Sequence, residues 1–310
     1  MKEKAINELV REVRIDSGLK QKDSRKNVMG AAAYSRIENG KKELTVNELI
    51  GVLGNLQISL FEFVSSYVEP RISQSIRKKF RDLFYGLPSE ESQNEIFMMY
   101  DNLEKRYPDL ATDELGVYFD IKAIFHQRFP KKINPITKKQ LKDVLHKVER
   151  KSRMKYFDED YRLISQTIMD MDKEDMRRIL DNIFPIRRSE NLTERSKDYI
   201  NNIFLNTLTP MLKAYDYEMI DYIFNIVKTH DFLYENSYYH RLNLKYLENF
   251  YDFLITNDVS KLENVNDIVR TFELLGDTRT ANAMREEMKH ILDGVGRECL
   301  SKNFILIGKK

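Results

Sequence analysis

The sequence predicts an all-α protein, and three observations support this prediction. Its 310 residues contain only 11 Gly and 7 Pro, too few for sandwiches, barrels or doubly wound α/β folds, which need many tight turns. Apolar residues recur at helical spacing along most of the chain. Hydrophobic residues make up 42% and charged residues 32%, which is typical of a globular chain with a sizeable core. At this length we expect two domains.

The first 66 residues predict a small domain of five short helices. This segment contains five of the eleven Gly, and its 11 Lys and Arg against 9 Asp and Glu account for the whole net charge of +2. Frequent Gly between short apolar-periodic stretches indicates short helices joined by tight turns. We expect the helices at 3–16, 20–27, 31–38, 45–54 and 59–67.

Beyond a predicted linker at 67–75, longer amphipathic helices predict a repeat domain over 76–295, followed by a C-terminal tail at 296–310. The helices come in pairs that start about forty residues apart, a period typical of α-solenoids. We expect a right-handed solenoid of tetratricopeptide-like pairs, although the standard pattern of those repeats is missing. The expected pairs are 74–85 with 89–106, 112–129 with 137–150, 155–171 with 173–184, 196–214 with 217–229 and 236–256 with 261–275, and a single helix follows at 278–293.

Several classes of protein are excluded by simple features. The single Cys, Cys299, excludes a disulfide framework or a cysteine-based zinc site and fits a reducing cytoplasm. The N-terminus has no signal-peptide core, and no window approaches eighteen apolar residues, so we expect a cytoplasmic protein without a membrane partner. The five His form no metal-binding motif, and phosphate-binding glycine loops and nucleophile elbows are missing. We therefore expect no catalytic residue, no metal, no cofactor and no enzymatic activity.

The segment 19–64 predicts a helix-turn-helix that binds DNA. Gln21 opens a short helix, and a second helix at 31–38 ends at Asn39-Gly40, a pair that supplies the left-handed residue of a C-cap. The second helix of such a motif presents small or hydrogen-bonding side chains to base edges from its N-terminal end. The candidate DNA-binding residues are Lys20, Gln21, Ala31, Ala32, Ser35, Arg36, Lys41 and Lys42.

These candidates differ in the part of DNA that they would contact. Ala31 and Ala32 suit the methyl groups of thymine, and Ser35 can bond to a base or to a phosphate. Gln21 and the three lysines would contact phosphates and set the register. The alternative for all of them is an ordinary solvated helix surface.

Arg36 has a specific alternative to DNA contact. Its guanidinium can pair with a nearby carboxylate, such as that of Glu38 or Glu43, and brace the domain instead.

The stretch YSRIENGKKELTVNELIGVLGNLQISLFEF at 34–63 resembles the XRE-type helix-turn-helix and, within that group, the Rgg/MutR class of bacterial regulators. The resemblance is specific over 19–64 and extends loosely along the whole chain, because that family carries a C-terminal domain of five repeat-like helix pairs. It implies a homodimeric transcriptional regulator that binds double-stranded promoter DNA. It also implies that the repeat domain binds a short hydrophobic signalling peptide, as in quorum sensing.

The chain departs from the family pattern in three ways. Ser24 and Arg25 stand where the first motif helix usually has apolar residues, which leaves Val28 and Met29 to hold that helix. The second helix begins with three Ala, which shifts the expected specificity toward methyl contacts and DNA shape. In some family members a Cys in the DNA-binding domain, here called the head, bridges the dimer. The only Cys of this chain is Cys299, so that bridge should be absent.

Two helices of the predicted repeat domain carry candidate peptide-binding residues. Helix 196–214 has Asn202 and Asn206 opposite its apolar face, and paired amides suit the backbone of an extended peptide. Helix 236–256 is apolar or aromatic outside one narrow charged stripe. It is therefore covered by neighbouring repeats and a dimer partner, or else Tyr239, Asn243 and Tyr246 line a groove for a peptide.

A third helix, 155–171, places Arg162 and Gln166 on a polar stripe. Arg162 can bind a peptide carboxylate with two hydrogen bonds, or it can belong to a surface stripe of salt bridges. The candidate peptide-binding residues are Arg162, Gln166, Asn202, Asn206, Tyr239, Asn243 and Tyr246.

Two other functions stay open: a ligand-independent dimeric regulator, and a protein–protein scaffold whose head does not bind DNA. The predicted head carries a net charge of only +2, and DNA affinity rises with the number of phosphates that are neutralised. We therefore expect a dimer, which links two weakly binding heads at high effective concentration.

Overall fold

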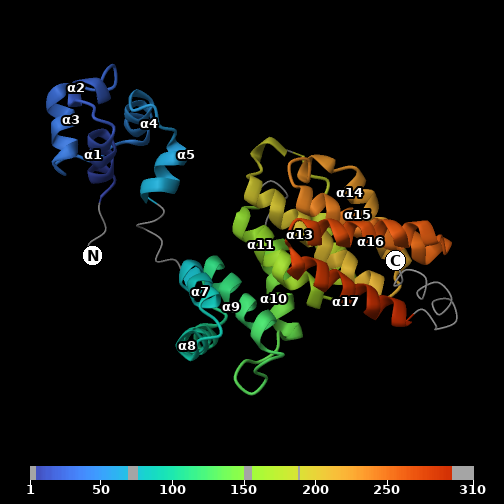
Figure 1. Cartoon of the computed structure of the whole chain (residues 1–310). Coiled ribbons are helices and arrows are strands. Elements are labelled where there is room, and N and C mark those ends of the chain that lie inside the picture. The colour runs from blue at the N-terminus through green and yellow to red at the C-terminus, as the bar shows by residue number, and fades with distance from the viewer. Residues whose placement is uncertain (1–4, 69–75, 150–155, 188, 295–310) are drawn as a thin grey trace. The chain divides into compact units, whose positions relative to one another are not determined.

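The structure, a computed structural model, describes residues 5–68, 76–149, 156–187 and 189–294, and every regular element in these ranges is helical (Figure 1). The predicted all-α fold is therefore confirmed. The chain divides into two compact units, Met1–Ile96 and Phe97–Lys310, so the division falls within α8 (Glu90–Arg106). The limits predicted for the helix-turn-helix domain, the linker and the repeat domain stay predictions. The predicted tail with Cys299 lies outside the described residues.

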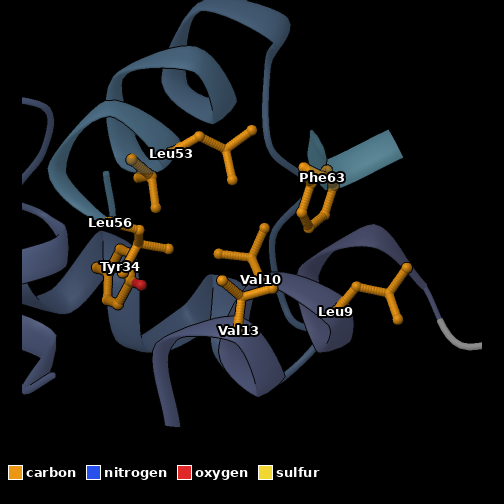
Figure 2. Packing of buried hydrophobic residues seen from close by; sticks show 8 residues of the cluster. Leu9, Val10, Val13, Tyr34, Leu53, Leu56 and Phe63 are labelled. Carbon is orange, nitrogen blue, oxygen red and sulfur yellow. The ribbon is translucent and has the colours of Figure 1, made fainter. Parts of the chain in front are cut away.

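In the N-terminal unit, the short helices between Ile6 and Val68 pack around one hydrophobic core, and a further helix, α7, follows them in the chain. Leu9, Val10 and Val13 of the first helix face Leu53 and Phe63 (Figure 2), because their spacing places them on one helix face. The helices are α1 (Ile6–Asp16), α2 (Gln21–Ser24), α3 (Ala31–Glu38), α4 (Val46–Asn55), α5 (Leu60–Phe63), a π-helical turn η1 (Val64–Val68) and α7 (Ile76–Tyr85).

Capping residues explain where α4 and α5 begin. The Thr45 hydroxyl accepts a hydrogen bond from the Glu48 backbone N–H, and the Glu48 carboxylate accepts one from the Thr45 N–H. Ser59 and Glu62 repeat this reciprocal arrangement, which satisfies backbone donors that a helix start leaves unpaired. By contrast, α2 ends earlier than predicted, and Asn27 in the following turn has a φ of 58°.

The C-terminal unit consists of antiparallel helix pairs, with α13 near its centre. α13 contacts α11, α14, α15 and α17, and α11 also packs against α9 (Figure 1). The helices are α9 (Thr112–Phe125), α10 (Lys138–Glu149), α11 (Asp158–Thr167), α12 (Lys173–Ile183), α13 (Glu194–Lys213), α14 (Tyr217–Lys228), α15 (Tyr238–Thr256), α16 (Val259–Leu274) and α17 (Thr278–Gly294).

Membrane-spanning helices and metal-binding clusters were both sought among the residues that the structure describes. No single helix is long and apolar enough to cross a membrane, and only the bent pair Val46–Asn55 with Leu60–Tyr67 passes that test by length and composition. Within the same residues, no group of three or more His, Cys, Asp or Glu side chains is arranged to hold a metal ion.

Candidate DNA-binding and peptide-binding sites

Asn55 fixes the turn between α2 and α3. Its side-chain amide nitrogen, at the end of α4, donates to the backbone carbonyls of Ser24 at 2.9 Å and Lys26 at 2.8 Å. Both carbonyls belong to the segment that joins the two motif helices, so one side chain sets the direction in which the chain enters α3. No local pattern in the sequence marks Asn55, because its partners lie 31 and 29 residues away.

We predict that Asn55→Ala lowers the free energy of unfolding of the N-terminal unit by about 1–3 kcal/mol, because two carbonyls lose their donor. Urea denaturation of the full chain, followed by amide exchange in α2 and α3, measures the loss. Asn47→Ala is the matched control, since Asn47 is exposed on the same helix. A stability equal to that of the control would contradict the bracing role.

Glu38, at the end of α3, forms a buried ion pair with Arg14 of α1. Its carboxylate receives two hydrogen bonds from the Arg14 guanidinium of α1, at 2.5 and 2.9 Å, and its side chain is only 2% exposed. The Gln21 amide nitrogen donates to the same carboxylate at 2.7 Å. Burial alone raises the pKa of Glu38, but the hydrogen bonds from Arg14 and Gln21 outweigh it and hold the pKa below its usual value.

This arrangement corrects one interpretation and restricts another. Glu38 pairs with Arg14 and not with Arg36, so the expected brace exists but its cation comes from α1. Gln21 was predicted to contact phosphates, but its side-chain amide N–H donates to Glu38. Its side-chain oxygen stays available to accept a hydrogen bond from another donor.

Three of the predicted DNA-contacting cations are exposed on the motif. Lys20, Arg36 and Lys41 have no ion-pair or hydrogen-bond partner for their side chains among the residues that the structure describes. Lys42 pairs with Glu48 at 2.6 Å, so its charge is partly neutralised. Unpaired cations are the ones that gain most from contact with phosphates.

The small residues at the start of α3 are also accessible. Ala31 and Ala32 are exposed in its first turn, and Ser35 is partly exposed one turn later. Ala31 and Ala32 therefore lie in the N-terminal half of α3, the half that a recognition helix presents to base edges, and Ser35 follows one turn later. Ser24, one of the departures from the family pattern, is fully buried with its hydroxyl 3.5 Å from the Lys20 carbonyl.

In the C-terminal unit, Arg162 and Gln166 of α11 meet on one acidic side chain of α9. Arg162 donates to Asp120 at 2.5 Å and to Glu159 at 3.0 Å, and Gln166 also donates to Asp120. The ion pairs of the salt-bridge alternative are therefore present. Arg162 itself is buried, at 5% exposed, while the carboxylates of Asp120 and Glu159 are partly exposed. Burial lowers the pKa of Arg162, but the two carboxylates outweigh burial and the net shift is upward.

Two further features of this cluster were not visible in the sequence. The Gln166 side-chain oxygen is buried and has no hydrogen-bond partner among the described residues. Gly116 of α9 lies so close that a Cβ there would approach Arg162 Nη1 to 2.5 Å. The backbone of α9 therefore leaves room for the guanidinium, and a buried acceptor next to it is open to a donor from a ligand.

The predicted polar stripe of α13 forms a seam with the neighbouring helices. Asn206 donates to the Ser165 carbonyl of α11 at 2.6 Å, and the Asn202 side-chain oxygen lies 3.2 Å from His240 Nε2 of α15. Each amide is partly used within the fold and is half-buried. The stripe is therefore not a plain solvent-exposed surface.

A pocket of about 630 Å³ lies between α13, α15 and α17. Tyr239 and Asn243 line it from α15, and Lys213 lines it from the end of α13. Burial raises the pKa of Glu287, which lines the pocket from α17, while Lys213 and a hydrogen bond with Thr209 act in the opposite direction. An aromatic ring, an amide and charges of both signs thus converge on one concave surface.

Tyr246 does not line this groove, and that part of the prediction is wrong. Its ring is 1% exposed and its hydroxyl donates to the Met284 carbonyl of α17 at 3.0 Å. Tyr239, by contrast, is 47% exposed. α15 packs against α13 and α16. The alternative in which this helix is covered by its neighbours therefore holds for Tyr246. Tyr239 and Asn243 of the same helix line the pocket.

One protein family matches part of the sequence. Residues 159–286 match the family described as the HTH-type transcriptional regulator Rgg, C-terminal domain. The matched segment runs from α11 into α17 and includes all the candidate peptide-binding residues. A search of curated proteins finds no match.

Solved structures with the same fold cover nearly the whole chain. A bacterial peptide pheromone/receptor complex is 19% identical with a TM-score of 0.74, over 92% of this chain and 98% of that chain. The PrgX/cCF10 complex is 19% identical with a TM-score of 0.73, over 93% and 92%. The SHP pheromone receptor Rgg2 of Streptococcus dysgalactiae is 14% identical with a TM-score of 0.69, over 92% and 99%.

Proposed function

We propose that the chain is a peptide-controlled regulator of transcription, because residues 159–286 match the C-terminal domain of the HTH-type transcriptional regulator Rgg. Its N-terminal unit would bind promoter DNA as part of a homodimer in the cytoplasm, without enzymatic activity. Its C-terminal unit would bind a short apolar signalling peptide. The similar pheromone receptors, two of them solved as complexes, support this proposal.

The DNA-binding part is carried by the exposed face of the motif. Ala31 and Ala32 leave the first turn of α3 narrow enough to approach base edges, and Lys20, Arg36 and Lys41 surround it with unpaired charge. Two heads in a dimer would place their recognition helices about one helical turn of DNA apart, roughly 34 Å.

We predict that Arg36→Ala and Lys41→Ala each weaken binding to a promoter fragment about five- to tenfold without changing the melting temperature, because neither side chain has a partner in the fold. Fluorescence anisotropy at several salt concentrations measures this, and the slope of log affinity against log salt should fall by about 1 for each lost phosphate contact. Lys228→Ala, an exposed cation on α14, is the control. Unchanged affinity and slope in both variants would contradict the assignment.

The peptide-binding part is carried by one observation: the Gln166 oxygen is a buried acceptor without a partner, next to a buried arginine. Such an acceptor suits a peptide N–H, and the amides of Asn202 and Asn206 continue the polar line along α13. The pocket at Tyr239 and Asn243 then offers space for a side chain.

Isothermal titration of the full chain tests this part with synthetic octapeptides that match the C-terminal residues of short reading frames beside its gene. We expect one peptide to bind, and Gln166→Leu to weaken it about tenfold, since an apolar group replaces the acceptor. If none of these peptides binds, the ligand-independent regulator is favoured instead.

A further inference from the structure

A strongly basic segment of the chain lies in the C-terminal unit, outside the head. Residues 131–149 contain six Lys against two acidic residues. This excess of four charges in 19 residues is larger than the excess of two in the first 66 residues. A local concentration of one charge sign is a physical argument for a partner of the opposite sign.

The positive charge gathers on the exposed face of α10. The side chains of Lys138, Lys139 and Lys142 are exposed and have no ion-pair or hydrogen-bond partner within the described ranges. The acidic residue among them, Asp143, accepts a hydrogen bond from the Tyr107 hydroxyl at 2.6 Å. Three lysines therefore stand unpaired beside a carboxylate that is already hydrogen-bonded within the fold.

These lysines surround a hollow of about 740 Å³ between α10 and the start of α9. Its walls include apolar groups from Pro108, Leu115 and Val144, together with the ring of Tyr107. Leu115 and Val144 are buried and belong to the packing between the helices. The surface thus combines an apolar floor with a cationic rim, and neither belongs to the two candidate sites.

The shape and spacing of this surface decide which anion it fits. From Lys138 to Lys147, which also lines the hollow, α10 rises about 13 Å, so the charges follow a line longer than one phosphate group. Duplex DNA presents its phosphates on a convex surface and would leave the apolar floor unused. An extended or helical acidic segment with an apolar side chain at its centre uses both features.

We propose that the α10 hollow is a docking site for an acidic segment of a protein partner, anchored by one or more apolar side chains. The lysines attract the acidic residues, and the floor at Leu115 and Val144 buries the anchor. The site is separate from the peptide-binding cluster on α11 and α13, so the protein can hold a signalling peptide and a protein partner together.

Anisotropy with a fluorescein-labelled dodecapeptide tests the proposal on the full chain. The probe has Glu residues on both sides of a central Leu-Leu-Phe, and a second probe has Ser-Ser-Ser at its centre. We expect the first probe to bind at least about fivefold more tightly than the second. Lys138→Glu combined with Lys142→Glu should weaken the first probe about tenfold or more, because it reverses the rim charge. Lys138 lies in the first turn of α10, where Glu is favourable for the helix.

The matched control is Arg195→Glu combined with Lys228→Glu, which makes the same change of charge on exposed positions of the same unit and should change affinity less than twofold. Three results would overturn the proposal: no binding of the first probe at millimolar concentration, equal binding of both probes, or binding that survives the reversal on α10. Random duplex DNA is titrated in parallel. If both probes bind equally, and the charge reversal on α10 weakens DNA as much as it weakens the probes, the surface is a general polyanion site and the proposal is wrong.

Discussion

Glu38→Ala should remove about 3–5 kcal/mol from the stability of the N-terminal unit and abolish DNA binding. The substitution leaves the Arg14 guanidinium, which is 13% exposed, without the carboxylate that receives both of its ion-pair hydrogen bonds. Removing one partner of a buried ion pair costs this much because the remaining charge is uncompensated. A small domain has little stability in reserve, so α1 and α3 should separate.

Urea denaturation read by amide exchange in α1 and α3 measures this loss, since exchange reports each unit of the full chain separately. Glu43→Ala is the control: Glu43 is exposed and has no partner within the part of the chain that the structure describes. A loss equal to that of the control would show that the Arg14–Glu38 pair does not hold the head together.

The same pair predicts a pH dependence with a definite sign. The pKa of Glu38 is lowered in the folded head from its usual value of 4.5. Its contribution to stability is therefore complete above 4.5 and is lost as the pH falls through the lowered folded value. Amide exchange in α3 should accelerate on acidification, and Glu38→Gln should flatten this part of the profile.

Tyr246→Ala should destabilise the C-terminal unit by about 3–5 kcal/mol, because it leaves a cavity among α15, α13 and α17. Tyr239→Ala, on the same helix, should cost less than about 1 kcal/mol, because its ring is half-exposed. Peptide affinity should show the opposite order, since Tyr239 lines the pocket and Tyr246 does not. Thermal unfolding and peptide titration of both variants provide the comparison.

Tyr246→Phe separates the ring from the hydroxyl. It keeps the packing and removes the hydroxyl's bonds to the Met284 carbonyl and to the Glu287 carboxyl group, so we expect a loss of about 1–2 kcal/mol. Equal stability of the two alanine variants, or a peptide affinity that falls only in Tyr246→Ala, would contradict the placement of the pocket.

The sequence predicts the elements of the head well because their signals are local. Turn glycines, the Thr45–Glu48 and Ser59–Glu62 capping boxes and the apolar spacing of α1 all act within a few residues. The partner of Glu38 is not a local signal, because Arg14 lies 24 positions earlier in another helix. For the same reason the pattern around Arg36 leaves its pairing with Glu38 or Glu43 open, and no local pattern marks Asn55.

In the C-terminal unit, periodicity identifies the polar stripe of α13 but not its neighbours. α15 is apolar around most of its circumference, so its pattern does not tell which side meets α16 and which side lines a pocket. The choice between Tyr239 and Tyr246 depends on long-range packing. The α10 hollow was missed for another reason: the charges beyond residue 66 balance in total, and that sum conceals a strongly basic segment.

The central claim is that a peptide bound to the C-terminal unit changes how the N-terminal unit binds DNA. The most direct measurement is a titration of a promoter fragment with the full chain, with and without a saturating concentration of an octapeptide that binds by calorimetry. We predict that the peptide shifts the DNA dissociation constant about tenfold in either direction, a coupling of about 1.4 kcal/mol, and that Gln166→Leu removes the shift. DNA titrations that superimpose with and without the bound peptide would contradict the claim.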